Sequence, residues 1–299
     1  MASCKVISCF SYKGGAGRST LALNTIPFLA DELNANPKNP LVVVDMDIDS
    51  CGLTYLFEAD VTNGVNYHTV QTLFGKNGNI PPALSDDIED HLLFNGLVPV
   101  GQFFHRDPKS ILFLPAAPGV SLGEFGNSYE GTSQYVKEFI EVCKDFDVAG
   151  VFLDSAVGDQ LTAQWSNSIS KYVICCLRPT KQFRDGTKRF FEKFDEKYAN
   201  KKVIVVPNVV PTEELVVNSH KYPEHAKKEI IKNFNINISK DVNAYIMDLV
   251  EDDIFGVPKI DRFMWQEGIL DNLAKDELTI CENQALKQYR KIASIIANK

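Results

Sequence analysis

The hydrophobic pattern along the chain predicts strands that alternate with helices. Continuous apolar runs of the kind that strands buried on both faces need lie at residues 4–10, 41–45, 111–114, 149–154, 172–177 and 202–206. Segments with helical periodicity lie at residues 19–33, 131–144, 160–169, 181–198 and 279–297. This alternation predicts an α/β fold: a mainly parallel twisted sheet with helices on both faces.

Length and composition predict a single domain. The chain has 299 residues, of which 44% are hydrophobic and 23% charged, as in a soluble protein with a sizeable core. No Ser/Gly-rich or Pro-rich linker divides it. We therefore expect one domain over 1–299, with a turn-rich, acidic surface insertion at about 60–110 that could bind a partner.

The amino terminus and the cysteines predict a cytoplasmic protein. The chain begins directly with the first apolar run, without a signal peptide, and no apolar stretch approaches the ~20 residues of a membrane span. The seven cysteines form no C-x-x-C pair, which indicates buried thiols in a reducing compartment. The five histidines are scattered, so we expect no zinc site.

A glycine-rich loop joins the first predicted strand to the first predicted helix, and residues 13–20 read Lys-Gly-Gly-Ala-Gly-Arg-Ser-Thr. Gly14, Gly15 and Gly17 allow a backbone that turns successive N–H groups into one concavity, where they can cradle phosphate oxygens. Ser19 is the hydroxyl expected to coordinate Mg²⁺. A glycine turn without a ligand is the alternative, but the strand–loop–helix context favours a phosphate site.

This loop departs from the standard G-x-x-x-x-G-K-[ST] pattern at two positions. Tyr12 stands at the first glycine position, and Arg18 stands at the lysine position. Arginine keeps the positive charge and can bind phosphate oxygens bidentately, but it is longer and planar, so the exchange is not conservative. Three outcomes stay open: slow hydrolysis, binding without hydrolysis, or near-normal activity in which Lys13 takes a larger share.

Acidic residues follow two of the predicted buried strands. Asp45 and Asp47 stand at and just after the end of the run at 41–45, and Asp154 ends the run at 149–154. The carboxyl ends of parallel strands form the ligand-binding edge of an α/β sheet. In a protein with a phosphate loop, an aspartate such as Asp154 typically holds Mg²⁺ or its water.

Taken together, these motifs resemble the ParA/MinD family of deviant Walker ATPases, whose loop typically reads K-G-G-x-G-K-[ST]. Lys13 matches the family's signature lysine, which reaches across a nucleotide-sandwich dimer to the partner's phosphates. Asp47 matches the acid that helps to position the attacking water, and Asp154 matches the Walker B acid. Asn208 resembles the asparagine that contacts adenine.

The resemblance covers most of residues 4–210 and becomes weak over a variable region at about 211–250. It implies a P-loop ATPase, nearer to ParA than to MinD, with ATP and Mg²⁺ as cofactors. The residues that it implies are catalytic Lys13, Asp47 and Asp154; nucleotide-binding Gly14, Gly15, Ala16, Gly17, Arg18, Ser19, Thr20 and Asn208; and metal-binding Ser19, Asp47 and Asp154.

The net charge of −8 limits any DNA-binding surface to a local basic patch. One candidate patch consists of Arg178, Lys181, Arg184 and Lys188, with Arg189 beside them, and a second consists of Lys221, Lys227, Lys228 and Lys232. An ordinary solvated helix face gives the same pattern as either patch. DNA, another scaffold and a protein partner therefore all stay open.

The last predicted helix bears on membrane binding. Its apolar stripe consists of Leu286, Tyr289, Ala293 and Ile296. A MinD-like amphipathic helix that lies on a membrane has this periodicity, and so does a final helix docked on the sheet. We favour docking because the stripe is narrow and lacks Phe or Trp.

We therefore expect an active but slow ATPase that acts as an ATP-switched homodimer in partitioning or positioning DNA or another cargo. A MinD-like membrane-associated ATPase is one alternative. A nucleotide-binding regulator or assembly factor, with little hydrolysis because of Arg18, is another.

Overall fold

A computed structural model describes residues 4–59, 67–75, 78–82, 87–120, 129–178, 180–193, 201–210, 243–244, 250–251, 254–264 and 268–298. The chain divides into two compact units. The first unit takes its residues from 1–8, 29–156 and 160–170, and the second from 9–28, 157–159 and 171–299. Each unit is described by itself below, and the single domain expected over 1–299 stays a prediction.

The sheet of the first unit is mainly parallel. Its strand order is β3-β4-β2-β5-β1, and the strands are β1 (Lys5–Ser11), β2 (Leu41–Asp45), β3 (Val98–Pro99), β4 (Ile111–Leu114) and β5 (Gly150–Val157). β2 pairs in parallel with both β4 and β5, whereas the two-residue β3 pairs antiparallel with β4 at the edge. β1 continues into the second unit from Cys9.

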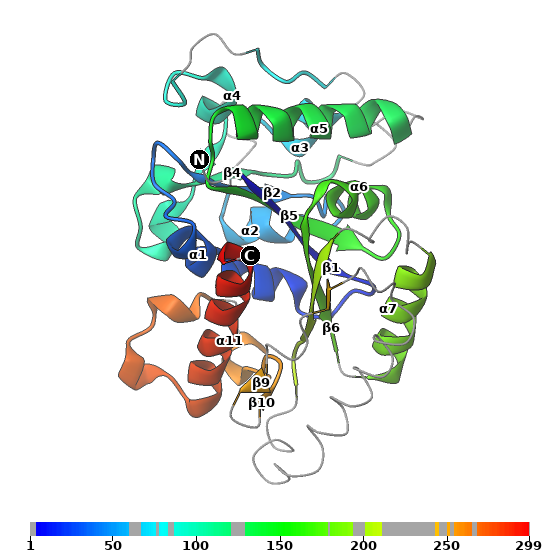
Figure 1. Ribbon diagram of the computed structural model, residues 1–299. Helices are drawn as coiled ribbons and strands as arrows, with labels where there is room; N and C mark the ends of the chain where they lie inside the picture. The colour runs from blue at the N-terminus through cyan, green and yellow to red at the C-terminus, as the bar shows by residue number, and fades with distance from the viewer. Residues whose placement is uncertain are drawn as a thin grey trace. The chain divides into compact units, whose positions relative to one another are not determined.

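Short and long helices pack on this sheet (Figure 1). They are α2 (Gly52–Leu56), α3 (Val70–Phe74), α4 (Leu92–Asn95), α5 (Tyr129–Asp145) and α6 (Leu161–Ile169), with 3-10 turns at Gly101–Phe104 and Pro108–Ser110. On one face, Phe74 of α3 and Phe139 of α5 meet edge to face at 5.4 Å within the core. On the other face, Phe113 of β4 packs against Phe57 at 4.9 Å.

The second unit contains the end of β1 and the rest of the chain. Its strand order is β1-β6-β7-β8, and its strands are β6 (Tyr172–Leu177), β7 (Lys202–Pro207) and β8 (Asn243–Ala244), with β9 (Val250–Glu251) and β10 (Ile254–Phe255) as a separate antiparallel pair. β6 and β7 pair in parallel, as do β7 and β8.

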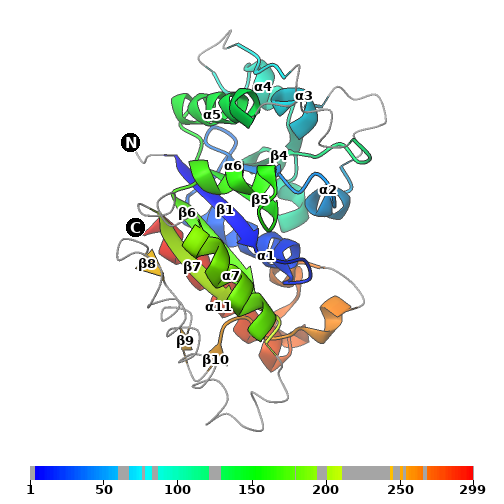
Figure 2. The same cartoon turned by 90° about the vertical axis from the view of Figure 1, so that its right-hand side faces the viewer.

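Helices cover both faces of the second unit's sheet. They are α1 (Arg18–Glu32, whose last residues belong to the first unit), α7 (Lys181–Lys193) and α11 (Ile280–Ala297), with 3-10 turns at Asp261–Met264, Leu270–Asn272 and Lys275–Glu277. Figure 2 shows α7 in front of β6 and β7, with α11 behind them. Phe190 of α7 stacks on Phe10 of β1 at 4.5 Å, and Tyr289 of α11 is 1% exposed.

The structure confirms the fold class and most element positions. β2, β4 and β6 have the bounds that the apolar runs predict, and α7 is described up to Lys193, so the rest of the helix expected at 181–198 lies outside the described residues. Described parts of 60–110 reach the core, because Leu73 and Phe94 are buried there; that this segment is an insertion stays a prediction. Most of the variable region at 211–250 lies outside the described residues, as does the second basic patch.

Candidate functional site

The glycine-rich loop leads from the end of β1 into the first turn of α1. Gly15 and Gly17 have φ angles of +79° and +77°, in the left-handed region that glycine adopts at no steric cost. α1 begins at Arg18, which is only 7% exposed, whereas Lys13 is exposed. The predicted strand–loop–helix arrangement is therefore present. Of the two cations that set this loop apart, Arg18 is buried and Lys13 faces the solvent.

Asn208 binds the loop from the end of β7. Its side-chain amide donates to the carbonyl oxygens of Ala16 and Gly17, at 2.9 and 3.0 Å. Two carbonyl oxygens can only accept, so the amide nitrogen must be the atom that faces the loop, and the amide oxygen of Asn208 remains for a ligand. The structure thus brings together Asn208 and the loop, which stand about 190 residues apart in the sequence.

Buried thiols support the same loop. The Cys176 Sγ–H of β6 donates to the Ala16 carbonyl oxygen at 3.2 Å, and Cys9 Sγ lies 4.0 Å from the Arg18 carbonyl oxygen. Both cysteines are fully buried. The sequence predicts their burial, but it gives no signal that they contact the loop.

A pocket of about 230 Å³ opens beside the loop within the second unit. Its lining combines the loop with residues from other segments: Gly15, Gly17, Thr20, Arg178, Asn208, Val209, Pro258, Lys259, Ile260, Phe263 and Tyr289. Arg178, which we assigned to the DNA patch, lines this pocket. Lys259 forms an ion pair with Asp261 at 2.9 Å. Sequence reasoning missed Lys259 and Phe263, which follow the region where the resemblance is weak.

The acidic residues of the first unit lie at and just after the end of β2 and at the neighbouring position of β5. Asp45 and Asp154 occupy paired positions of the two strands, and both are fully buried. Burial, and then the neighbouring Asp154, raise the pKa of Asp45 to about 7, although the Thr54 backbone N–H and hydroxyl both donate to its carboxylate. Asp47 is 6% exposed and accepts a hydrogen bond from the Ser50 hydroxyl.

Sequence reasoning gave no role to Asp45 or Thr54. Thr54 lies in α2. Its hydroxyl donates to the Asp45 carboxylate, as described above, and accepts from the Ala116 backbone N–H at 3.0 Å. The signal for Asp45 was present, since it is the first acid of the Asp45-Met46-Asp47 pair. No sequence signal indicated Thr54, because a threonine in a short helix forms no pattern that sets it apart from other threonines.

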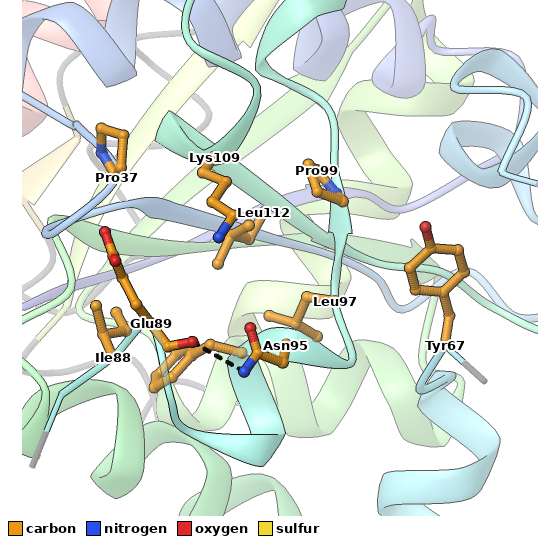
Figure 3. A pocket seen from close by; sticks show the side chains of 10 residues that line it. Pro37, Tyr67, Ile88, Glu89, Asn95, Leu97, Pro99, Lys109 and Leu112 are labelled. Carbon is orange, nitrogen blue, oxygen red and sulfur yellow. Dashed lines mark hydrogen bonds between the residues drawn. The ribbon is translucent and has the colours of Figure 1, made fainter. Parts of the chain in front are cut away.

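A second pocket, of about 160 Å³, lies in the first unit (Figure 3). Its floor is apolar, formed by Ile88, Phe94, Leu97 and Leu112. Lys109 and Glu89 stand on its rim, and the Asn95 side chain donates to the Glu89 carbonyl oxygen at 2.9 Å. These residues belong to the segment at 60–110 and its surroundings, and none of them was predicted to be functional.

The described residues offer neither a clustered metal site nor a membrane-spanning helix. In this part of the chain, no three His, Cys, Asp or Glu side chains are grouped so that they alone could hold a metal ion. No helix there has the length and apolar character needed to cross a membrane.

Solved structures share this fold over nearly the whole chain. McdA of Cyanothece in complex with ATP aligns with a TM-score of 0.62 at 11% identity, covering 96% of this chain and 97% of that one. A putative plasmid partition protein of Borrelia burgdorferi bound to AMPPNP gives 0.59 at 16% identity, covering 98% of each chain. The septum site-determining protein MinD of Pyrococcus horikoshii, complexed with Mg-ADP, gives 0.58 at 18% identity, covering 97% and 94%.

The chain therefore has the fold of the ParA/MinD ATPases, which confirms the fold class and the family resemblance at the level of the fold. Structures with this fold include complexes with ATP, AMPPNP and Mg-ADP. No protein-family model matches the chain, and no curated protein matches it either.

Proposed function

We propose that this protein is a ParA-type MgATPase that works as a nucleotide-switched homodimer in the cytoplasm. The observation that carries the proposal is the position of Asn208, which binds the carbonyl oxygens of Ala16 and Gly17 and lines the pocket beside them. A cradle for phosphates thus adjoins a pocket of about 230 Å³ that a nucleoside can enter.

The residues present fit a nucleotide with Mg²⁺. A Cβ added to Gly14 or Gly15 would meet no atom within 4 Å, so the space beside these glycines is open. Mg²⁺ that is bound together with phosphates needs only one or two protein carboxylates and a hydroxyl. Asp154, Asp47 and Ser19 are groups of that kind.

Each of these residues has a distinct task in the proposed reaction. The backbone N–H groups of the loop and the guanidinium of Arg18 bind phosphate oxygens, and Ser19 and Asp154 hold the metal. Asp47 orients the attacking water, and the Ser50 hydroxyl fixes its carboxylate. When bound, Mg²⁺ supplies the neutralisation of phosphate charge that phosphoryl transfer requires.

Adenine is the base that we propose for the pocket. Because the Asn208 amide nitrogen is occupied by the loop, its oxygen is the end available to a base. An amide oxygen accepts from the 6-amino group of adenine, but it faces an oxygen at the same place in guanine. ATP is therefore favoured over GTP.

Lys13 supports the proposed dimer. Its side chain is exposed, as a group that binds phosphates of a second subunit must be. Arg18 is buried, so it serves the loop of its own chain. We propose slow hydrolysis, because the planar guanidinium replaces the compact ammonium at this position.

DNA is the proposed cargo or scaffold, bound through Lys181, Arg184 and Lys188 of α7. Lys181 is exposed and Lys188 is half-buried, while the side chain of Arg184 lies outside the described part of the structure. The MinD-like alternative needs an apolar stripe available to lipid. Tyr289, Ala293 and Ile296 are at most 1% exposed, which favours the docked reading of α11 over membrane attachment.

Light scattering and ATP turnover test the proposal together. We expect ATP to produce a dimer in the wild type, a more persistent dimer in Asp47→Ala, and only monomer in Lys13→Ala. Lys38→Ala, at an exposed lysine outside the loop, is the matched control and should behave as the wild type.

Turnover in the presence of scaffolds decides between the alternatives. We expect duplex DNA, and not anionic liposomes, to stimulate ATP hydrolysis. Stimulation by liposomes alone supports the MinD-like alternative, and ATP binding without turnover under any condition supports a regulator. A protein that stays monomeric with ATP contradicts the switch.

A further inference from the structure

The side chain of Tyr12 connects the front of the phosphate loop with helix α7. Tyr12 occupies the first glycine position of the loop pattern and immediately precedes Lys13. Its half-buried ring meets Phe190 of α7 edge to face, with ring centroids 6.5 Å apart. Both residues belong to the second unit.

Gly186 is the place where α7 accepts this ring. A Cβ added to Gly186 would overlap the Tyr12 ring carbons Cδ1 and Cε1. Glycine inside a helix is unfavourable by roughly 1 kcal/mol relative to alanine. The close approach of Tyr12 gives a physical reason for a glycine at this position.

Further contacts fix both partners. Phe190 also stacks on Phe10 of β1, with ring centroids 4.5 Å apart, which holds α7 against the strand that precedes the loop. On the backbone side, the Gly158 N–H donates to the Ser11 carbonyl oxygen at 3.0 Å. Tyr12 therefore follows a fixed backbone position and lies against a fixed helix.

The outer side of α7 carries the cations. Phe183, Gly186, Thr187 and Phe190 are buried and form the inner face of the helix, whereas Lys181 and Arg189 are exposed. The face that contacts Tyr12 and the face that presents cations thus belong to one rigid element of three to four turns.

We infer that Tyr12 is a positioning residue that transmits the nucleotide state of the loop to α7 and its cationic face. In this inference, phosphate binding shifts the backbone between Tyr12 and Gly15, in front of the peptides of residues 16–18 that Asn208 holds in place. The Tyr12 ring cannot follow this shift without moving against Gly186 and Phe190. This inference rests on the proposed function, since it requires that the loop bind nucleotide.

Hydrogen–deuterium exchange over residues 181–193, with and without the ATP analogue AMPPNP, tests the inference directly. In the wild type we expect the analogue to slow exchange in α7 by about 5-fold or more, the lower end of typical coupling between sites. Tyr12→Phe keeps the ring and should retain this protection. Tyr12→Ala and Gly186→Ala should lose it, although they still bind the analogue.

Gln182→Ala, on the exposed side of α7, is the matched control and should keep the protection. A change in folding alone would alter exchange equally with and without nucleotide, so the ratio of the two rates is the readout. Equal protection in Tyr12→Ala and wild type overturns the inference, as does a wild type that binds AMPPNP without protecting α7.

Binding to a 30-base-pair DNA duplex extends the test to the cations. We expect ATP to strengthen this binding in the wild type and in Tyr12→Phe, but by a factor at least about 5-fold smaller in Tyr12→Ala. DNA binding that depends on ATP equally in all three proteins contradicts the inference. A wild type that binds AMPPNP and protects α7, yet binds no DNA, contradicts only the proposed cargo.

Discussion

Asn208 lies so close to Gly17 that a Cβ added to this glycine would stand 2.6 Å from the Asn208 amide nitrogen. The same nitrogen donates to the Gly17 carbonyl oxygen. The end of β7 and the phosphate loop therefore fit each other only when residue 17 has no side chain.

Gly17→Ala should disrupt this fit. The added methyl group overlaps Asn208, and alanine at a φ of +77° costs about 1–3 kcal/mol. We expect a lower free energy of unfolding, measured with urea, and at least about 10-fold weaker ATP binding. Gly14→Ala is the control for stability, because its Cβ meets no atom within 4 Å. Equal destabilisation by both substitutions would disprove the role given to Asn208.

Asn208→Asp should weaken the binding of ATP and GTP alike, because it removes the donor that holds the loop. A carboxylate cannot donate to the carbonyl oxygens of Ala16 and Gly17, and leaving these bonds unmade costs about 1–3 kcal/mol. Titration with fluorescent ATP and GTP analogues measures the result. We expect the wild type to prefer ATP by about 10-fold or more, and the variant to bind both nucleotides weakly. Equal affinity of the wild type for the two nucleotides contradicts the orientation proposed for the base.

Arg18→Lys should raise the rate of ATP hydrolysis. Lysine places a compact ammonium where the buried guanidinium stands, which restores the usual residue of a phosphate loop. We expect steady-state turnover to rise by about 10-fold, which corresponds to about 1.4 kcal/mol in the barrier. An unchanged rate would mean that Lys13 or another group stabilises the negative charge on the phosphates during hydrolysis. The double variant Arg18→Lys with Lys13→Ala would show whether that group is Lys13.

The buried His91 should make the stability of the protein depend on pH. Its Nδ1 accepts from the Leu93 N–H at 3.1 Å at the start of α4, and burial lowers the pKa of the ring below its ordinary value of 6.5. The unfolded chain therefore takes up the proton first, and stability is lost as the pH falls through about 6.5. Between pH 7.5 and 5.5 the loss reaches at most about 1.4 kcal/mol.

His91→Asn provides the comparison for this effect. Asparagine keeps an acceptor at the start of α4 but does not titrate, so urea unfolding should show a smaller loss of stability between the two pH values. The asparagine also loses the packing of the ring against Phe94 and Phe146. The slope with pH, rather than the stability itself, is therefore compared. Identical slopes would assign the effect to other residues.

The buried strands could be predicted from the sequence because their apolar runs are unbroken. The observed bounds of β2, β4 and β6 are the predicted ones. An unbroken apolar run of this length is typical of a strand buried in a sheet that helices cover on both faces. β5 was predicted to end at Asp154 but continues to Val157. The polar residues Asp154 and Ser155 interrupt the apolar run, so the sequence pattern places the end of the strand too early. α3 and α4 have five and four residues, too few to show a helical period.

The candidate site could be predicted only in part. The loop and the acids have local patterns, so the sequence indicates them without any knowledge of the fold. The family resemblance pointed to Asn208 as a residue that contacts adenine. Its contact with Ala16 joins segments far apart in the chain, and nothing in the sequence indicated it. The Cys176 and Thr54 hydrogen bonds have no sequence signal, because burial and helix position say nothing about the partner of a side chain.

The bonds that Ala16 and Gly17 accept also set the direction of the donors in the loop. The peptide bonds of the described loop residues are trans, and in a trans peptide the C=O and the following N–H point in opposite directions. Asn208 and Cys176 hold the Ala16 carbonyl on their side, which turns the N–H of Gly17 the other way; Asn208 and the Leu21 N–H do the same for the N–H of Arg18. The peptide planes are thus oriented before any anion arrives, so its binding need not bear the entropic cost of ordering them.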